Sequence, residues 1–253
     1  MRGKVSFYGL SRSASNLKYF GKIYMPLYEA TIEDFFSAMP ALVFAEAFIY
    51  DMDKKTEHMQ KAGIRMNDMR SDVALARKQL ASTLKAAGAY NAYVEGEISN
   101  LSRYIDLETK VVRGAIPRQE LGAVLDEMLR LRSSDLRLLH HIFLKSKKIT
   151  PISKLLHAIM PLEMLYELED EIKDYHRDHK SGVFNSIRTS KQISRKLTAQ
   201  TTYALIKKLE SEFMLDADAL TEPYRTRMKK VFLTYRAVMP AISLGRLKKI
   251  VEA

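Results

Sequence analysis

The sequence predicts a single all-α domain spanning residues 1–253, a bundle of about eight to ten helices. Three observations lead to this prediction. Apolar residues recur with helical spacing in most segments, and no stretch alternates apolar and polar residues over the length of a strand. The chain has 253 residues, 47% of them hydrophobic, which is enough to bury one substantial core.

The composition narrows the classes of function. The absence of cysteine excludes disulfides, zinc–thiolate sites and cysteine nucleophiles. Lys and Arg outnumber Asp and Glu by 41 to 30, and the net charge of +11 favours nucleic acid, phospholipid headgroups or phosphorylated substrates. No apolar run approaches the roughly 20 residues of a membrane span, and the N-terminus lacks an apolar core of secretory length. We therefore expect a cytoplasmic protein.

The N-terminal third predicts a basic segment followed by a buried helix. Residues 1–18 are expected to form either a flexible basic arm or a first short helix; their basic residues are Arg2, Lys4, Arg12 and Lys18. Thr31 followed by Asp34 is typical of a helix N-cap, and the strongly apolar segment from there to Asp53 predicts a core helix. Negative charge at a helix C-terminus interacts unfavourably with the helix dipole. Asp51 and Asp53 there therefore indicate either that the chain leaves the core for solvent at this point or that the two acids belong to a functional site.

Further helical segments follow along the chain. Glycine after the last apolar position ends two of them, at Gly88 and Gly182. The expected ranges are 67–87, 90–106, 117–143, 150–182, 189–214, 221–238 and 241–251.

A row of acids dominates the segment from 150 to 182. Asp170, Asp174 and Asp178 are spaced i, i+4, i+8, which places them on one face of a helix. Because stacked like charges destabilise a helix, water, basic neighbours or a bound cation must offset them. Lys173, Arg177 and Lys180 could do so in a solvated helix, whereas Mg²⁺ would make the row a metal site.

The stretch LYELEDEIKDYHRDHKSG resembles the second aspartate-rich motif of the class I isoprenoid synthases, which include trans-prenyltransferases and terpene cyclases. Asp170, Glu171 and Asp174 match its acidic positions, with Glu in place of the second Asp. DMDKKTE loosely resembles the first motif. The resemblance implies a helical bundle around a central apolar cavity, Mg²⁺ (or Mn²⁺) as cofactor, and Asp51, Asp170 and Asp174 as catalytic residues. The implied metal ligands are Asp51, Asp53, Glu57, Asp170, Glu171, Asp174 and Asp178.

Basic residues would hold the substrate diphosphate. The segment Gly21-Lys22-Ile23-Tyr24-Met25-Pro26-Leu27 resembles a prenyltransferase segment that binds diphosphate, with Ile23 and Met25 in place of arginines; a glycine turn before a helix explains it equally well. The Arg-Arg-Gly segment of the family is replaced by Lys61-Ala62-Gly63-Ile64-Arg65. The diphosphate-binding residues that the resemblance implies are Lys22, Arg65, Arg132, Arg177, Lys180 and Arg188.

The loss of these arginines bears on the reaction, because arginine binds phosphate oxygens bidentately. A depleted second diphosphate site favours a terpene synthase that ionises one allylic prenyl diphosphate and cyclises or rearranges it. Two alternatives stay open: a prenyltransferase that condenses an allylic diphosphate with isopentenyl diphosphate, and a non-catalytic basic helical protein that binds nucleic acid or a membrane surface. We expect no specific nucleic acid; a homodimer and peripheral membrane contact stay open.

Histidines supply a competing candidate for a metal site. His140 and His141 are adjacent, and His176 and His179 are spaced i, i+3, but neither pair has an identifiable set of further ligands. We therefore expect all four to be surface or capping residues.

Overall fold

The computed structural model describes residues 5–193 and 198–252, and within these ranges the regular elements are α-helices, with no strand. The prediction of an all-α protein is confirmed. The helices form two compact units. The first comprises the described residues up to Thr109 together with Ser134–Ile152, and the second comprises Lys110–Ser133 together with the described residues from Ser153 onward.

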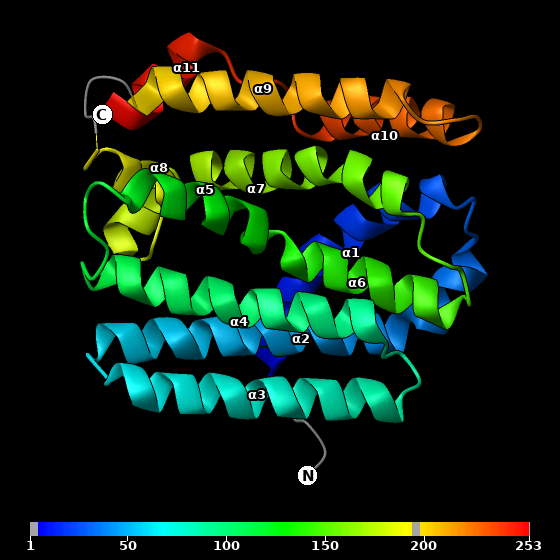
Figure 1. Ribbon diagram of the computed structural model, residues 1–253, viewed down its shortest axis with the longest axis horizontal. Coiled ribbons are helices and arrows are strands. Elements are labelled where there is room, and N and C mark those ends of the chain that lie inside the picture. The colour runs from blue at the N-terminus through cyan, green and yellow to red at the C-terminus, as the bar shows by residue number, and fades with distance from the viewer. Residues whose placement is uncertain (1–4, 194–197, 253) are drawn as a thin grey trace. The chain divides into compact units, whose positions relative to one another are not determined.

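In the first unit, α2 is the central helix. It packs against three other helices, α1, α3 and α6, and Figure 1 shows α2 and α3 running side by side. The helices of this unit are α1 (Phe7–Leu27), α2 (Ile32–Lys61), α3 (Met66–Ala86), α4 (Ala92–Val112), whose last residues belong to the second unit, and α6 (Ser134–Ser146).

The predicted N-cap of α2 is confirmed. The Thr31 amide donates to Asp34 Oδ2 at 2.9 Å, and the Asp34 amide donates to Thr31 Oγ1 at 3.2 Å. This reciprocal capping box satisfies two amides that have no partner within the helix.

The core of the first unit forms where α1 crosses α6. The Phe20 ring stacks on Tyr24 and packs edge-on against Phe143, and all three side chains are buried. This packing keeps α1 helical through Gly21, so the alternative of a glycine turn before a helix is wrong. The basic segment is likewise helical from Phe7 onward, and Arg2 and Lys4 lie outside the described residues.

Helix α2 continues to Lys61, past the acids that were expected at its C-terminal end, so that boundary is wrong. The buried Thr56 donates its hydroxyl to the Met52 carbonyl, and Gly63, with φ of 66°, follows the helix end. The acids from Asp51 to Glu57 are therefore in mid-helix, so the helix-dipole argument for a functional role does not apply to them.

In the second unit, α7 is the central helix, in contact with α5, α8, α9, α10 and α11 (Figure 1). The helices of this unit are α5 (Leu121–Arg132), α7 (Ser153–Ser181), α8 (Ser186–Ser190), α9 (Thr198–Asp218), α10 (Tyr224–Val238) and α11 (Leu244–Glu252). The prediction of a single helix over 117–143 is wrong, because the helix is interrupted at Ser133, between α5 and α6. Ser133, Ser134 and Asp135 at the break are residue types that bond to nearby backbone and favour helix ends.

A partly buried ionic network joins α7, α9 and α10. Arg236 Nη1 lies 2.7 Å from Glu169 Oε1, and Arg236 Nη2 lies 2.5 Å from Glu210 Oε1. The Tyr235 hydroxyl donates to Glu169 as well. This network orients α7 within its unit.

Among the described helices, none combines the length and the apolar character needed to cross a bilayer.

Candidate functional site

The candidate site is the acidic row, Asp170, Asp174 and Asp178, on the C-terminal half of α7. Asp170 and Asp174 lie one turn apart and are both half-buried. The exposed Arg177 guanidinium forms an ion pair with Asp174, and its Nε lies 3.7 Å from Asp178 Oδ1. The sequence spacing therefore places carboxylates and a cation next to each other at the surface of the second unit.

The surroundings of Asp170 disfavour its ionised form when Asp174 is already charged. Burial raises the pKa of Asp170, and the charge of Asp174 raises it further. The positive charges of Lys173, Arg132 and Arg177 lower this pKa and offset part of the rise. An added cation would favour the ionised form of Asp170 for the same reason.

Glu171, next to Asp170 on α7, is buried. Its carboxylate lies 2.7 Å from Arg132 Nη1 and accepts from the Ser186 amide at 3.1 Å and from the Ser186 hydroxyl. Arg132 Nε also lies 2.9 Å from Glu167 Oε2. Glu171, predicted as a metal ligand, and Arg132, predicted to bind diphosphate, thus hold α5, α7 and α8 together.

Asp178 ends the row and is held by the loop that follows α7. The fully buried Asn185 donates its side-chain amide to Asp178 Oδ2 at 3.1 Å and to the Glu171 carbonyl at 3.0 Å. Arg188 donates to the Asp178 carbonyl at 3.3 Å and also to the Val183 carbonyl. These bonds fold the loop back against the acidic row.

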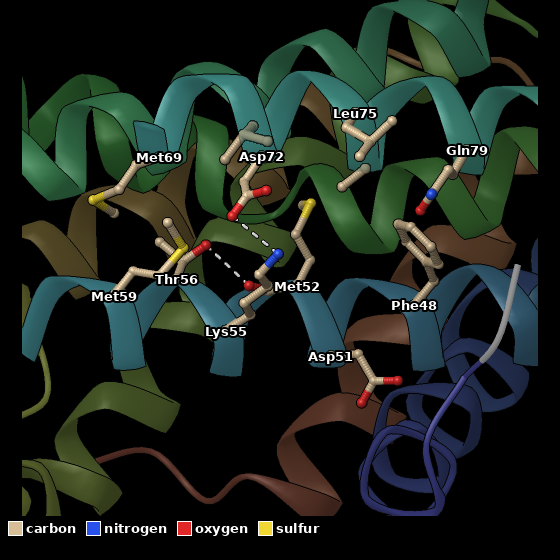
Figure 2. A pocket seen from close by; sticks show the side chains of 12 residues that line it. Phe48, Asp51, Met52, Lys55, Thr56, Met59, Met69, Asp72, Leu75 and Gln79 are labelled. Atoms are coloured by element: carbon tan, nitrogen blue, oxygen red, sulfur yellow. Dashed lines mark hydrogen bonds and ion pairs between the residues drawn. The ribbon is translucent and has the colours of Figure 1, made fainter. Parts of the chain in front are cut away.

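The acids of the predicted first motif lie in the first unit, on α2. Asp51 accepts a hydrogen bond from the Ser6 amide at 2.6 Å and another from the Ser6 hydroxyl, so it caps the start of α1. Figure 2 shows Asp51 on the side of α2 that faces away from α3. Asp53 and Glu57 are half-buried and share another face of α2 at i, i+4 spacing.

An apolar groove lies between α2 and α3 (Figure 2). It encloses about 230 Å³, which is smaller than the ~300 Å³ at the lower end of typical ligand pockets. Lys55 Nζ lies 3.0 Å from Asp72 Oδ2 across the groove. Its apolar lining comes mainly from Phe48, Met52, Met59, Met69, Val73 and Leu75.

The remaining predicted diphosphate-binding residues are distributed over both units. Lys22 is half-buried on α1, and the exposed Arg65 precedes α3, where its Nε lies 3.0 Å from Asp68 Oδ2. Lys180 is exposed in the last turn of α7, one turn beyond Arg177. In the second unit, Arg177 and Lys180 are thus the exposed members of the predicted set that share a helix with the acidic row.

The donors of the acidic row suit a magnesium site that the substrate completes. Within residues 5–193 and 198–252, no three His, Asp or Glu side chains lie close enough together to hold a metal. Magnesium, however, is usually bound through one or two carboxylates together with water and substrate phosphate oxygens. Asp170 and Asp174 could supply those carboxylates. That the α2 acids face them across a cavity stays a prediction, because the two groups belong to different units.

The histidine prediction is wrong for one pair and right for the other. His140 is 0% exposed and His141 is 4% exposed, whereas His176 and His179 are exposed. His140 Nε2 lies 2.8 Å from the Tyr28 hydroxyl, and burial lowers the pKa of His140 well below its usual value of 6.5. Aromatic rings from two helices cover the first pair: the Tyr24 ring of α1 lies 4.4 Å from that of His140, and the Tyr93 ring of α4 stacks on His141 at 5.1 Å.

Two residues next to the acidic row, Asn185 and Ser186, were not among the predicted site residues. Their position after Gly182 carried a usable signal, since Asn is a favoured N-cap residue and the Asn185 side chain caps α8 by accepting from the Arg188 amide. Their contacts with Glu171 and Asp178 depend on how the loop folds back, which residue spacing does not indicate.

Comparison with known proteins does not assign a family to the chain. No family model, no curated protein and no solved structure matches it.

Proposed function

We propose that the protein is a magnesium-dependent class I isoprenoid synthase that ionises an allylic prenyl diphosphate and cyclises or rearranges the resulting carbocation. The observation that carries the proposal is the arrangement of α7. Glu171 and Asp178 are held by Asn185 and Ser186. The half-buried Asp170 and Asp174 lie one turn apart beside the exposed Arg177. The proposal further rests on the resemblance of this stretch to the second aspartate-rich motif.

Asp170 and Asp174 would hold the magnesium ions together with the substrate diphosphate. The bound metal would supply positive charge that stabilises the departing diphosphate. Arg177 pairs with Asp174 in the structure, and its exposed guanidinium could instead bind phosphate oxygens bidentately. Glu171, Arg132 and Asn185 would act as positioning residues, because their buried contacts hold the loop and α8 against the acidic row.

The basic residues of the second unit support the ionisation of a single diphosphate. Two of the four predicted there are engaged elsewhere: Arg132 with Glu167 and Glu171, and Arg188 with the Asp178 and Val183 carbonyls. The exposed Arg177 and Lys180 remain on the helix that carries the row. One diphosphate is what a terpene synthase requires, whereas an elongating prenyltransferase needs a second site for isopentenyl diphosphate.

The test is a product assay on the purified full chain. The protein is incubated with Mg²⁺ and geranyl, farnesyl or geranylgeranyl diphosphate, each with and without isopentenyl diphosphate. We expect hydrocarbon or alcohol products from an allylic substrate alone, and none in EDTA. Asp170→Asn and Asp174→Asn should each remove most of the turnover while circular dichroism stays unchanged.

Asp218→Asn is the matched control, because Asp218 is a surface acid on α9 whose Oδ1 lies 2.6 Å from Lys229 Nζ. It should leave turnover unchanged. Longer linear diphosphates that form only with isopentenyl diphosphate would show elongation instead. Full turnover in EDTA, or in both α7 variants, would refute the metal-dependent mechanism.

A further inference from the structure

The first turns of α1 combine exposed apolar side chains with positive charge. Phe7 is 85% exposed, and Tyr8 and Leu10 are each 40% exposed. Helix α1 contains three basic residues, Arg12, Lys18 and Lys22, and no Asp or Glu. Large apolar side chains this exposed at a helix start point to a partner that buries them.

The backbone that presents these side chains is fixed to α2. Asp51 accepts hydrogen bonds from the Ser6 amide and hydroxyl, and the hydroxyl also accepts from the Gly9 amide at 3.1 Å. A Cβ on Gly9 would lie only 2.4 Å from the Ala47 carbonyl oxygen, so the two helices touch there through their backbones. The exposed side chains therefore project from an anchored helix end.

Cations surround this anchored end. Lys54 Nζ lies 3.9 Å from the centre of the Tyr8 ring, and the Arg12 guanidinium lies 5.6 Å from the centre of the Tyr50 ring. Phe7, Leu10 and Lys18 are spaced i, i+3, i+11, which places them on one face of α1, and all three are exposed. Asp51, an acid in contact with this segment, is bonded to Ser6. The surface thus combines an apolar centre with a positive border.

We propose that this surface, formed by Phe7, Tyr8, Leu10, Arg12, Lys18 and Lys54, docks onto an anionic lipid bilayer. Phe7 and Leu10 would enter the boundary between headgroups and acyl chains, while the cations attract anionic headgroups. The charge complementarity of α1 favours a bilayer, because a nucleic acid backbone would match the cations and leave the aliphatic Leu10 without a partner. This inference is independent of the proposed enzymatic function.

The experiment is co-sedimentation of the full chain with vesicles. One set contains phosphatidylcholine alone, and the other contains phosphatidylcholine with phosphatidylglycerol. We expect binding to the anionic vesicles that weakens with added salt. The double variant Phe7→Ser/Leu10→Ser should bind about tenfold more weakly. Lys18→Gln should reduce binding about fivefold, because one cation near an anionic membrane contributes about 1 kcal/mol.

The matched control is Leu233→Ser on α10, which removes an apolar side chain that is 70% exposed and lies near Lys229 and Lys230. It should bind like the parent protein. Since the substituted side chains are exposed, urea denaturation should show that all variants stay folded. Loss of binding by a misfolded variant would thereby be recognised.

Four results would overturn the proposal, and the fourth concerns nucleic acid. The first is failure of the parent protein to bind anionic vesicles, and the second is equal binding by the double variant. The third is light scattering that shows a dimer which the double variant dissociates, because this would assign the surface to a contact between two copies. If single-stranded RNA displaced the protein from vesicles and bound the double variant equally well, the cations would be a nucleic-acid site instead. A negative vesicle result would leave the product assay unaffected.

Discussion

At the scale of single residues, neighbouring acids on one helix have different roles. Glu171 is 3% exposed and bonded to Arg132 and Ser186, whereas Asp174 is partly exposed and pairs with the solvent-facing side chain of Arg177. Sequence spacing alone treats both as members of one motif. Their surroundings predict opposite consequences for stability and for metal binding.

Glu171→Ala should lower the free energy of unfolding by about 2–4 kcal/mol, because it leaves the Arg132 charge and the Ser186 amide without this acceptor. Asp174→Ala should change it by no more than about 0.5 kcal/mol, since an ion pair with a solvent-exposed partner, here Arg177, contributes little. Urea denaturation of both variants measures the difference. Equal stability of the two variants would contradict a structural role for Glu171.

The buried His140 predicts a pH dependence of stability. Burial and the neighbouring His141 lower its pKa in the folded protein, whereas in the unfolded chain it has its usual value of 6.5. Below that pH the unfolded chain therefore binds more protons than the folded one, and stability should fall as the pH drops below about 6.5. Above it, His140 should make no contribution to the pH dependence.

Urea denaturation between pH 8 and pH 5 tests this sign, with pH points that span the usual histidine pKa of about 6.5. His140→Gln should flatten the dependence, while His176→Gln, on the surface of α7, should leave it unchanged. If the His140→Gln protein loses stability on acidification as steeply as the parent does, another group is responsible.

At the scale of elements, the crossing of α1 over α2 is set by Gly9. Gly9→Ala should destabilise the protein by about 1–3 kcal/mol, because the new Cβ would overlap the Ala47 carbonyl oxygen and force the helices apart. Gly96→Ala is the matched control, since Gly96 lies inside α4 and a Cβ added there would have no neighbouring atom within 4 Å among the described residues outside its own helix turn. It should stabilise the protein by about 0.5–1 kcal/mol through helix propensity.

Thermal unfolding of both glycine variants gives the comparison. Opposite signs are the expected outcome, and stabilisation by both substitutions would mean that α1 does not approach α2 closely at Gly9.

At the scale of the whole molecule, the proposed function predicts that ligand binding stabilises the fold. Mg²⁺ together with inorganic diphosphate should raise the melting temperature by roughly 5–10 °C at concentrations near 100 times the dissociation constant. Each alone should have a smaller effect, because the carboxylates and the diphosphate would complete one site together.

The double variant Asp170→Asn/Asp174→Asn should lose this shift, and Asp218→Asn should keep it. Differential scanning fluorimetry with EDTA as the metal-free reference measures the effect. An equal shift in the double variant would place the diphosphate elsewhere in the molecule.

Local signals predicted much of the secondary structure. The Thr31 cap, the helices near 67–87 and 221–238, and the all-α class depend on short-range spacing and residue propensity. These local sequence signals predicted the wrong helix boundaries where tertiary packing outweighed residue propensity. The core contacts of Phe20 and Tyr24 keep Gly21 inside α1, and the buried Thr56 lies in the part of α2 that continues past Asp53, where the apolar segment ends.

By itself, the sequence determined the helical class and the i, i+4, i+8 acidic row of α7, because helical periodicity places such residues on one face whatever surrounds them. Only the tertiary structure decided the state of each carboxylate. The return of the loop after Gly182 buries Asn185 against Asp178 and brings Ser186 to Glu171, while the docking of α1 engages Asp51 with Ser6. The first two contacts join α7 to the segment that follows it, and the third joins Ser6, the N-cap of α1, to a residue of α2 that is 45 positions away. Because each contact reaches beyond a single helix, its burial and hydrogen bonding cannot be read from the spacing of residues along that helix.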